Sequence, residues 1–145
     1  MKDTPDRPRL SVDLVREFLV PRLSSNPVYF VVLDCMRLDQ WRAIAPLLAE
    51  FFEIDETVHY SILPTATPYA RNAIFSGQYP DEIARAHPGW WDASDDEGSL
   101  NAFEDELLVE QLKRLTGRNV PVHYEKIFSD RQREQVRGRV NSALK

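Results

Sequence analysis

The stretch Val28-Tyr29-Phe30-Val31-Val32-Leu33-Asp34 decides the expected fold, because six apolar residues in succession end abruptly at a carboxylate. A short apolar run of this kind is typical of a strand that is buried on both faces of a sheet. Residues 56–63 place Val58, Tyr60 and Ile62 in alternation with other side chains, which favours a second strand.

Segments with helical periodicity lie around these strands. Helices are expected from Ser11, as the N-cap, to about Leu23, and from Thr67, with Pro68 next, to Gly77. A further helix is expected after Asp34 and another before Gly117, from apolar residues at helical spacing. The first contains Trp41, Ile44, Ala45, Leu48, Phe51 and Phe52, and Pro46 predicts either a kink or two short helices there; the second contains Phe103, Leu107, Leu108, Leu112 and Leu115. With a third, less regular strand over residues 120–128, the order predicts an α/β sheet with helices on its faces.

Composition narrows the classes of function. The chain has 145 residues and a formal net charge of −5, which suits one domain and argues against sequence-independent binding to duplex nucleic acid. Cys35 is the only cysteine, so no internal disulfide forms and a reducing cytoplasm is the expected compartment. Residues 1–6 lack the apolar core of a signal peptide, and no apolar run approaches the length of a membrane span.

Asp34 is the first candidate site residue. In open α/β sheets, ligands bind at the carboxyl ends of strands, where Asp34 would lie. A carboxylate in that position suits a cation such as zinc or magnesium. The alternative is an aspartate that caps the following helix, and position alone does not separate the two.

Thr67 is the second candidate. Its hydroxyl would sit at a helix N-terminus, where backbone N–H groups and the helix dipole favour negative charge. A threonine hydroxyl needs a base or a metal to become a nucleophile near neutral pH. A purely structural N-cap is the simpler interpretation of Thr67 taken alone, and Thr65 carries the same ambiguity with less support from the helix boundary.

Arg37 and Arg71 are candidate phosphate clamps, since a guanidinium suits bidentate contact with phosphate. An ordinary ion pair, for instance between Arg37 and Asp39, explains either residue equally well. The three histidines show no metal-ligand spacing among themselves, and the pair Trp90-Trp91 would either stack on a nucleotide ring or pack a loop onto the core.

Two segments in this order, Val31–Trp41 and Leu63–Gly77, resemble the PglZ domain of the alkaline phosphatase superfamily. The similarity covers roughly residues 25–128. It is strongest to the output domain of PorX-type response regulators, which belong to two-component signalling.

The resemblance implies a three-layer αβα fold with a mostly parallel central sheet and a site for two zinc ions. Asp34 matches the first metal-binding aspartate, and Thr67 matches a nucleophile that also touches a metal and forms a phosphothreonine. Arg37 and Arg71 remain tentative substrate contacts. The implied function is a zinc-dependent phosphoesterase, most naturally a phosphodiesterase, with an oligonucleotide as one candidate substrate and a receiver domain in the full-length protein.

The sequence departs from the family pattern in one respect. No Asp-His pair follows Thr67 to complete a two-metal site, so we expect a fragment. Residues 1–24 would be a tail and linker helix, and 25–145 the N-terminal part of the phosphoesterase domain. The main alternative is a non-catalytic signalling or interaction module. A haloacid-dehalogenase-type phosphatase is disfavoured because Met36 stands where its second aspartate would be.

Overall fold

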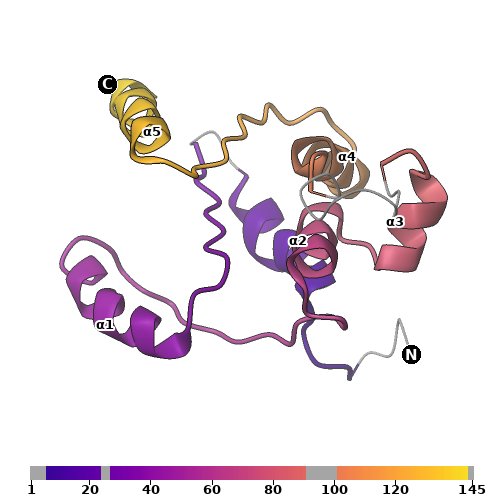
Figure 1. Ribbon diagram of the computed structural model, residues 1–145, viewed down its shortest axis with the longest axis horizontal. Helices are drawn as coiled ribbons and strands as arrows, with labels where there is room; N and C mark the ends of the chain where they lie inside the picture. Colours follow the sequence, from indigo (N-terminus) through magenta and orange to yellow (C-terminus); the bar gives the residue numbers. More distant parts are fainter. Residues whose placement is uncertain (1–5, 24–26, 91–100, 144–145) are drawn as a thin grey trace.

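The computed structural model describes residues 6–23, 27–90 and 101–143, and these form helices joined by long extended segments (Figure 1). The helices in chain order are η1 Ser11–Asp13, η2 Val15–Leu19, η3 Val20–Arg22, α1 Leu38–Leu48, α2 Thr67–Ser76, α3 Pro80–Ala86, α4 Glu104–Thr116 and α5 Asp130–Ala143. None of the helices described combines the length and apolar composition needed to cross a membrane.

The expected sheet is not found among the described residues. Their β pairing is limited to an isolated parallel bridge between Leu10 and Tyr60. There the Ser11 N–H donates to the Tyr60 carbonyl at 3.1 Å and the Tyr60 N–H donates to the Arg9 carbonyl at 2.9 Å. The prediction of a three-layer αβα fold with a mostly parallel central sheet is therefore wrong.

The segment 28–33 shows why the prediction failed. It is extended but is not buried on both faces as expected: Phe30 packs against the core, whereas Val31 and Leu33 are 71% and 61% exposed. A strand also needs backbone hydrogen bonds to a neighbouring strand. An apolar run favours extended backbone and burial, but it does not specify that partner.

The core lies where α2 and α4 pack together and receive the helical turns η1–η3. Figure 1 shows α2 beside α4, with the N-terminal turns below them. The larger apolar cluster contains Val15, Leu19, Phe75, Ile83, Leu107, Leu108 and Leu112. A smaller cluster, Val12, Ile62 and Ala73, joins η1 to α2. The N-terminal helical segment is thus part of the core.

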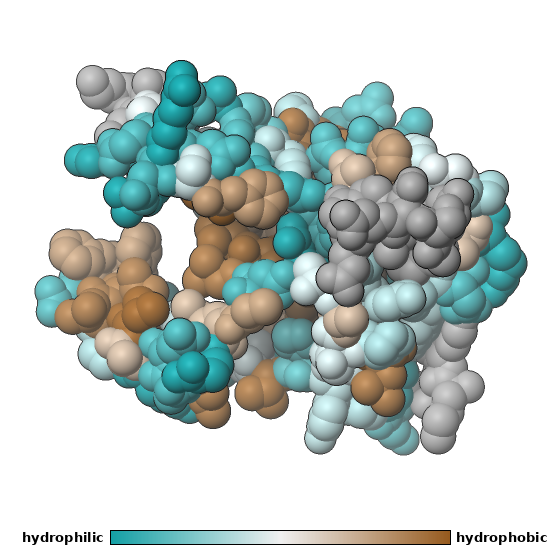
Figure 2. Space-filling view, in the orientation of Figure 1, coloured by the Kyte–Doolittle hydropathy of each residue, from teal (hydrophilic) through white to brown (hydrophobic). Residues whose placement is uncertain are grey.

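Helix α1 confirms the periodicity that predicted it but has no buried residue. Figure 1 shows α1 and α5 on the side of the molecule away from α2, α3 and α4. Apolar side chains gather over α1 in Figure 2, and Leu47, Phe51 and Phe52 are 62%, 78% and 65% exposed. The apolar face of α1 is therefore not part of the buried core that stabilises this structure.

The ends of α2 and α4 follow the sequence signals. Gly77 and Gly117 end the two helices in the left-handed conformation, with φ of 64° and 70°. The predicted N-cap of α2 is displaced by one residue: Ala66 is the N-cap, and Thr67 is the first helical residue.

Candidate active site

Asp34 lies at the end of the extended segment, where the chain turns sharply. Cys35 adopts a left-handed φ of 58°, and its N–H donates to the Asp34 carboxylate at 2.9 Å. Nη1 of Arg71 approaches the same carboxylate at 3.5 Å. An open hollow of about 500 Å³ borders Asp34, with apolar walls that include Met36 and Ile44. Asp34 is thus an exposed carboxylate with one cationic partner and free space beside it.

Thr67 stands half-buried in the first turn of α2. Arg71 is four residues further along, so both side chains project from the same helix face. Helical side chains lean toward the N-terminus, which directs Arg71 back toward the turn that Thr67 begins. Because Arg71 reaches Asp34, the Asp34 carboxylate is tied to α2 one helical turn after Thr67.

The exposed Arg37 is occupied by a local ion pair. Its Nε and Nη2 donate to the two Asp39 oxygens at 2.9 and 2.6 Å. This hydrogen bond lowers the pKa of Asp39 and raises that of Arg37. The structure thus shows the plain ion pair that the sequence offered as the alternative to a phosphate clamp.

A buried carboxylate, Glu104, is the residue that the functional interpretation of the sequence missed. It is fully buried at the start of α4 and accepts hydrogen bonds from Arg71 at 2.6 Å, Asn101 at 2.7 Å and the Tyr124 hydroxyl. Lys126 lies 3.2 Å away. Helical spacing could have revealed Glu104, because positions 104, 107, 108 and 111 share one face of α4.

Tyr124 is a donor in this cluster. Burial raises the pKa of its hydroxyl above the ordinary value, and the neighbouring Glu104 raises it further. The hydroxyl therefore stays protonated at neutral pH and donates a hydrogen bond to the Glu104 carboxylate. The Tyr124 ring also packs edge-on against Phe75, with ring centroids 5.8 Å apart, so the cluster is anchored in the core.

The histidines and the tryptophan pair have other surroundings. His87 stacks on Trp90 and lies 3.0 Å from Glu110, and Trp90 stacks on Phe103 in turn. Trp91 lies outside the described residues. His123 is exposed beside Glu125, while burial and the charge of Arg9 lower the pKa of His59.

The described residues do not fit a complete zinc centre. Within ranges 6–23, 27–90 and 101–143, no three His, Cys, Asp or Glu side chains gather where they could hold a metal ion. Asp34 has a guanidinium as its neighbour, whereas zinc takes about four protein or water ligands.

The chain matches the family described as the BREX system PglZ alkaline phosphatase-like domain over residues 14–142. The chain belongs to the PglZ family. The match spans most of the chain and places this PglZ domain among phosphoesterase-type proteins. No curated protein matches it.

Proposed function

We propose that this PglZ domain is a phosphoesterase that acts on phosphodiesters, with Thr67 as the nucleophile. The observation that supports the proposal is the contact between Arg71 and Asp34, which ties a carboxylate to α2 one helical turn after Thr67. Family membership supplies the reaction class. The helix N-terminus supplies backbone N–H groups and a dipole that favour a phosphate oxyanion.

The reaction proceeds by displacement at phosphorus. The Thr67 oxygen forms a bond to phosphorus and loses its proton, while the bond from phosphorus to the leaving alcohol oxygen breaks. The alcohol departs with that electron pair and takes up a proton. The intermediate is a threonyl phosphodiester that keeps the second ester group. Water then breaks its bond to Thr67, which restores the Thr67 hydroxyl and releases the phosphate monoester. Two steps through a covalent intermediate replace one difficult displacement.

The hollow beside Asp34 suits the organic part of such an ester. Its volume of about 500 Å³ falls within the range of small-molecule sites, and its walls are mainly apolar. An oligonucleotide end is one candidate substrate, in line with the resemblance to PorX-type output domains. That resemblance also leads us to propose a receiver domain as partner in a two-component system.

Zinc belongs to this proposal as a cofactor that Asp34 and Thr67 would contact. A threonine hydroxyl requires activation by a base or a metal, and the other ligands would come from outside the described residues. We expect the 145-residue chain by itself to bind zinc weakly. Stoichiometric binding of two zinc ions to this chain, measured by metal analysis after gel filtration, would contradict that expectation.

The decisive test is the Thr67→Ala variant, in protein produced at the length its gene encodes. Wild-type protein with zinc should hydrolyse bis(p-nitrophenyl) phosphate, and the variant should lose at least about a thousandfold in kcat, as nucleophile variants do. Acid-quenched wild type should carry a p-nitrophenyl phosphate group on Thr67 by mass spectrometry.

The exposed Thr57 provides the matched control, because Thr57→Ala removes a threonine hydroxyl that contacts only Arg9 among the hydrogen bonds described. That variant should keep wild-type turnover. Retained turnover in Thr67→Ala would overturn the nucleophile assignment. Folded wild-type protein without any turnover would favour the non-catalytic interaction module instead.

A further inference from the structure

Glu104 carries a buried charge that helix formation alone does not require. Acidic residues can stabilise the first turn of a helix from exposed positions, such as the position of Glu106 in the same turn. Burying a carboxylate costs free energy unless it is paired and hydrogen-bonded. Glu104 meets that condition through Arg71 and Lys126, so the burial of its charge depends on these two cations.

Arg71 connects this buried carboxylate to the candidate active site. Its Nη2 donates to Glu104 at 2.6 Å, and its Nη1 lies 3.5 Å from Asp34. Nε of Arg71 is buried and has no hydrogen-bond partner among the described residues, so both contacts are made through the Nη groups. Exposure rises along this path, from 0% for the Glu104 side chain to 19% for Arg71 and 39% for Asp34.

The charges around Arg71 argue for a role in positioning Asp34. A guanidinium between two carboxylates is already compensated, so it attracts a phosphate less than a free cation would. A fixed guanidinium does, however, hold the carboxylate that it contacts in one place. The shorter contact is the buried one, which means that Glu104 fixes the guanidinium and the guanidinium then fixes Asp34.

We propose that Glu104 is a positioning residue of the phosphoester site, which holds Arg71 against Asp34 so that Asp34 keeps its place beside α2. Arg71 therefore acts on Asp34 and does not clamp the substrate phosphate. This inference rests on the proposed phosphoesterase function of the same site.

The test compares Glu104→Gln and Arg71→Lys in protein of natural length, with inorganic phosphate as a competitive inhibitor. Each variant should lower kcat about 10- to 100-fold, the usual cost of losing a group that orients a ligand residue. The inhibition constant of phosphate should stay within about twofold of wild type, because ground-state anion binding is unchanged. The double variant should be no worse than either single variant.

Arg114→Met is the matched control. Arg114 also ties α4 to α2, through a 2.6 Å hydrogen bond to the Ser76 carbonyl, but at the opposite end of α2. It should lower stability without changing kcat. A phosphate inhibition constant raised about tenfold or more in Arg71→Lys, the mark of lost anion binding, would overturn the proposal. So would an unchanged kcat in Glu104→Gln.

A second readout needs no turnover and separates this inference from the proposed function. In ¹⁵N-arginine-labelled protein, the Nη signals of Arg71 should show slow rotation about the guanidinium bonds in wild type. They should be averaged in Glu104→Gln or, if that variant does not fold, in Glu104→Asp, whose shorter side chain withdraws the carboxylate from Arg71. Averaged Nη signals of Arg71 in wild type would contradict the positioning role of Glu104. Slow rotation in wild-type protein that lacks turnover would leave Arg71 fixed by Glu104 and refute only the phosphoesterase activity.

Discussion

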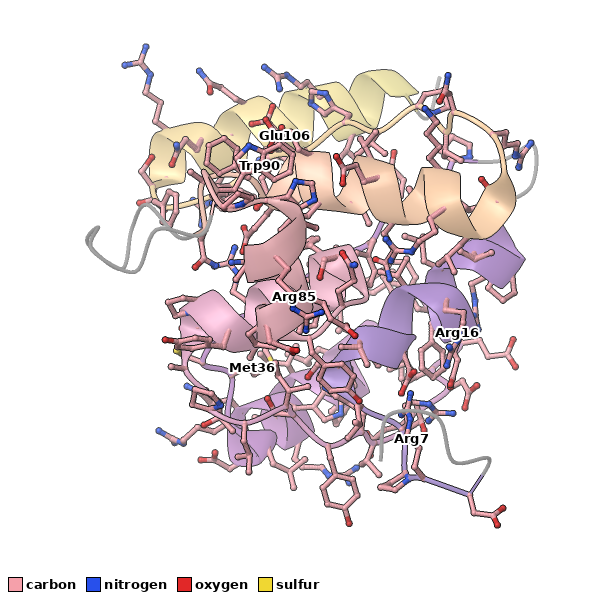
Figure 3. The ribbon with its side chains drawn as sticks, turned by 90° about the vertical axis from the view of Figure 1, so that its right-hand side faces the viewer. Arg7, Arg16, Met36, Arg85, Trp90 and Glu106 are labelled. Atoms are coloured by element: carbon pink, nitrogen blue, oxygen red, sulfur yellow. The ribbon has the colours of Figure 1, made fainter. Side chains whose placement is uncertain are left out.

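The carboxylate of Asp13 is almost fully buried, and several hydrogen-bond donors surround its charge. Nη1 and Nη2 of Arg7 donate to its carboxylate at 2.5 and 2.7 Å, and Arg16 does so at 2.7 Å. Figure 3 shows Arg7 and Arg16 on the same side of the N-terminal helical turns. The Leu10 N–H donates at 2.9 Å. The hydrogen bond from Arg7 is the largest cause of a lowered pKa of Asp13, against the opposing effect of burial.

Stability should depend on pH through Asp13. Because its pKa is lower in the folded state, the charged carboxylate stabilises the fold fully above its unfolded pKa of about 4, and this contribution is lost as pH falls through the folded pKa. Asp13→Asn should cost about 2 kcal/mol at pH 6, and the difference from wild type should shrink towards pH 3. Urea unfolding at both pH values measures this.

The exposed Asp130 is the control for that experiment. Its side chain is 92% exposed and 3.5 Å from Arg133, so Asp130→Asn should leave the free energy of unfolding nearly unchanged at both pH values. If Asp13→Asn is as stable as wild type at pH 6, the free-energy cost of burying the carboxylate cancels the stabilisation from its ion pairs.

Helix α2 contributes to both the core and the candidate site. Its C-terminal end packs tightly on α4: a Cβ atom on Gly77 would lie 2.0 Å from Nε2 of Gln111, which is itself 1% exposed. Gly117, at the end of α4, has a similar φ and open space around it. The two glycines have the same backbone requirement and differ in how closely they are packed.

Alanine at these two positions should separate backbone strain from packing. Gly117→Ala should cost about 1 kcal/mol, the penalty of the left-handed conformation for a residue with a Cβ. Gly77→Ala should cost about 1–3 kcal/mol more, because Gln111 must move in a packed interface. Thermal or urea unfolding of both variants measures the difference, and equal losses would mean that the α2–α4 contact is loose.

Apolar side chains divide the whole molecule into a packed half and an exposed half. Phe75 is 4% exposed and contacts the rings of Phe30 and Tyr124, whereas Phe52, after α1, is 65% exposed. The free energy of folding therefore comes mainly from the packing of α2, α4 and the N-terminal turns. The extended segments and α1 add surface that stays in contact with water.

The same substitution in the two halves should give opposite results. Phe75→Ala should cost about 3–5 kcal/mol, as for other buried phenylalanines. Phe52→Ala should change the free energy of unfolding by less than about 0.5 kcal/mol, because little of its surface is buried. Chemical denaturation monitored by circular dichroism compares them, and a large loss in Phe52→Ala would mean that α1 is covered in solution.

Sequence periodicity and helix-end signals located α1, α2 and α4, whereas α3 and α5 were not predicted. Apolar spacing predicted α1 and α4, and Gly77 and Gly117 end α2 and α4 as expected. These features depend on residues within a few positions of each other, so the sequence contains the information directly. The same local signals located Asp34 and Thr67, whose roles as metal ligand and nucleophile stay predictions.

Tertiary structure alone decided the pairing of distant segments. Whether residues 28–33 join a sheet depends on a neighbouring strand, and in the described residues that neighbour is not present. Likewise, helical spacing places Glu104 on the apolar face of α4, but only folding brings Arg71, 33 positions earlier, within 2.6 Å of it. Backbone pairing and the burial of a charge are both settled by partners far away in the chain, which local sequence patterns do not name.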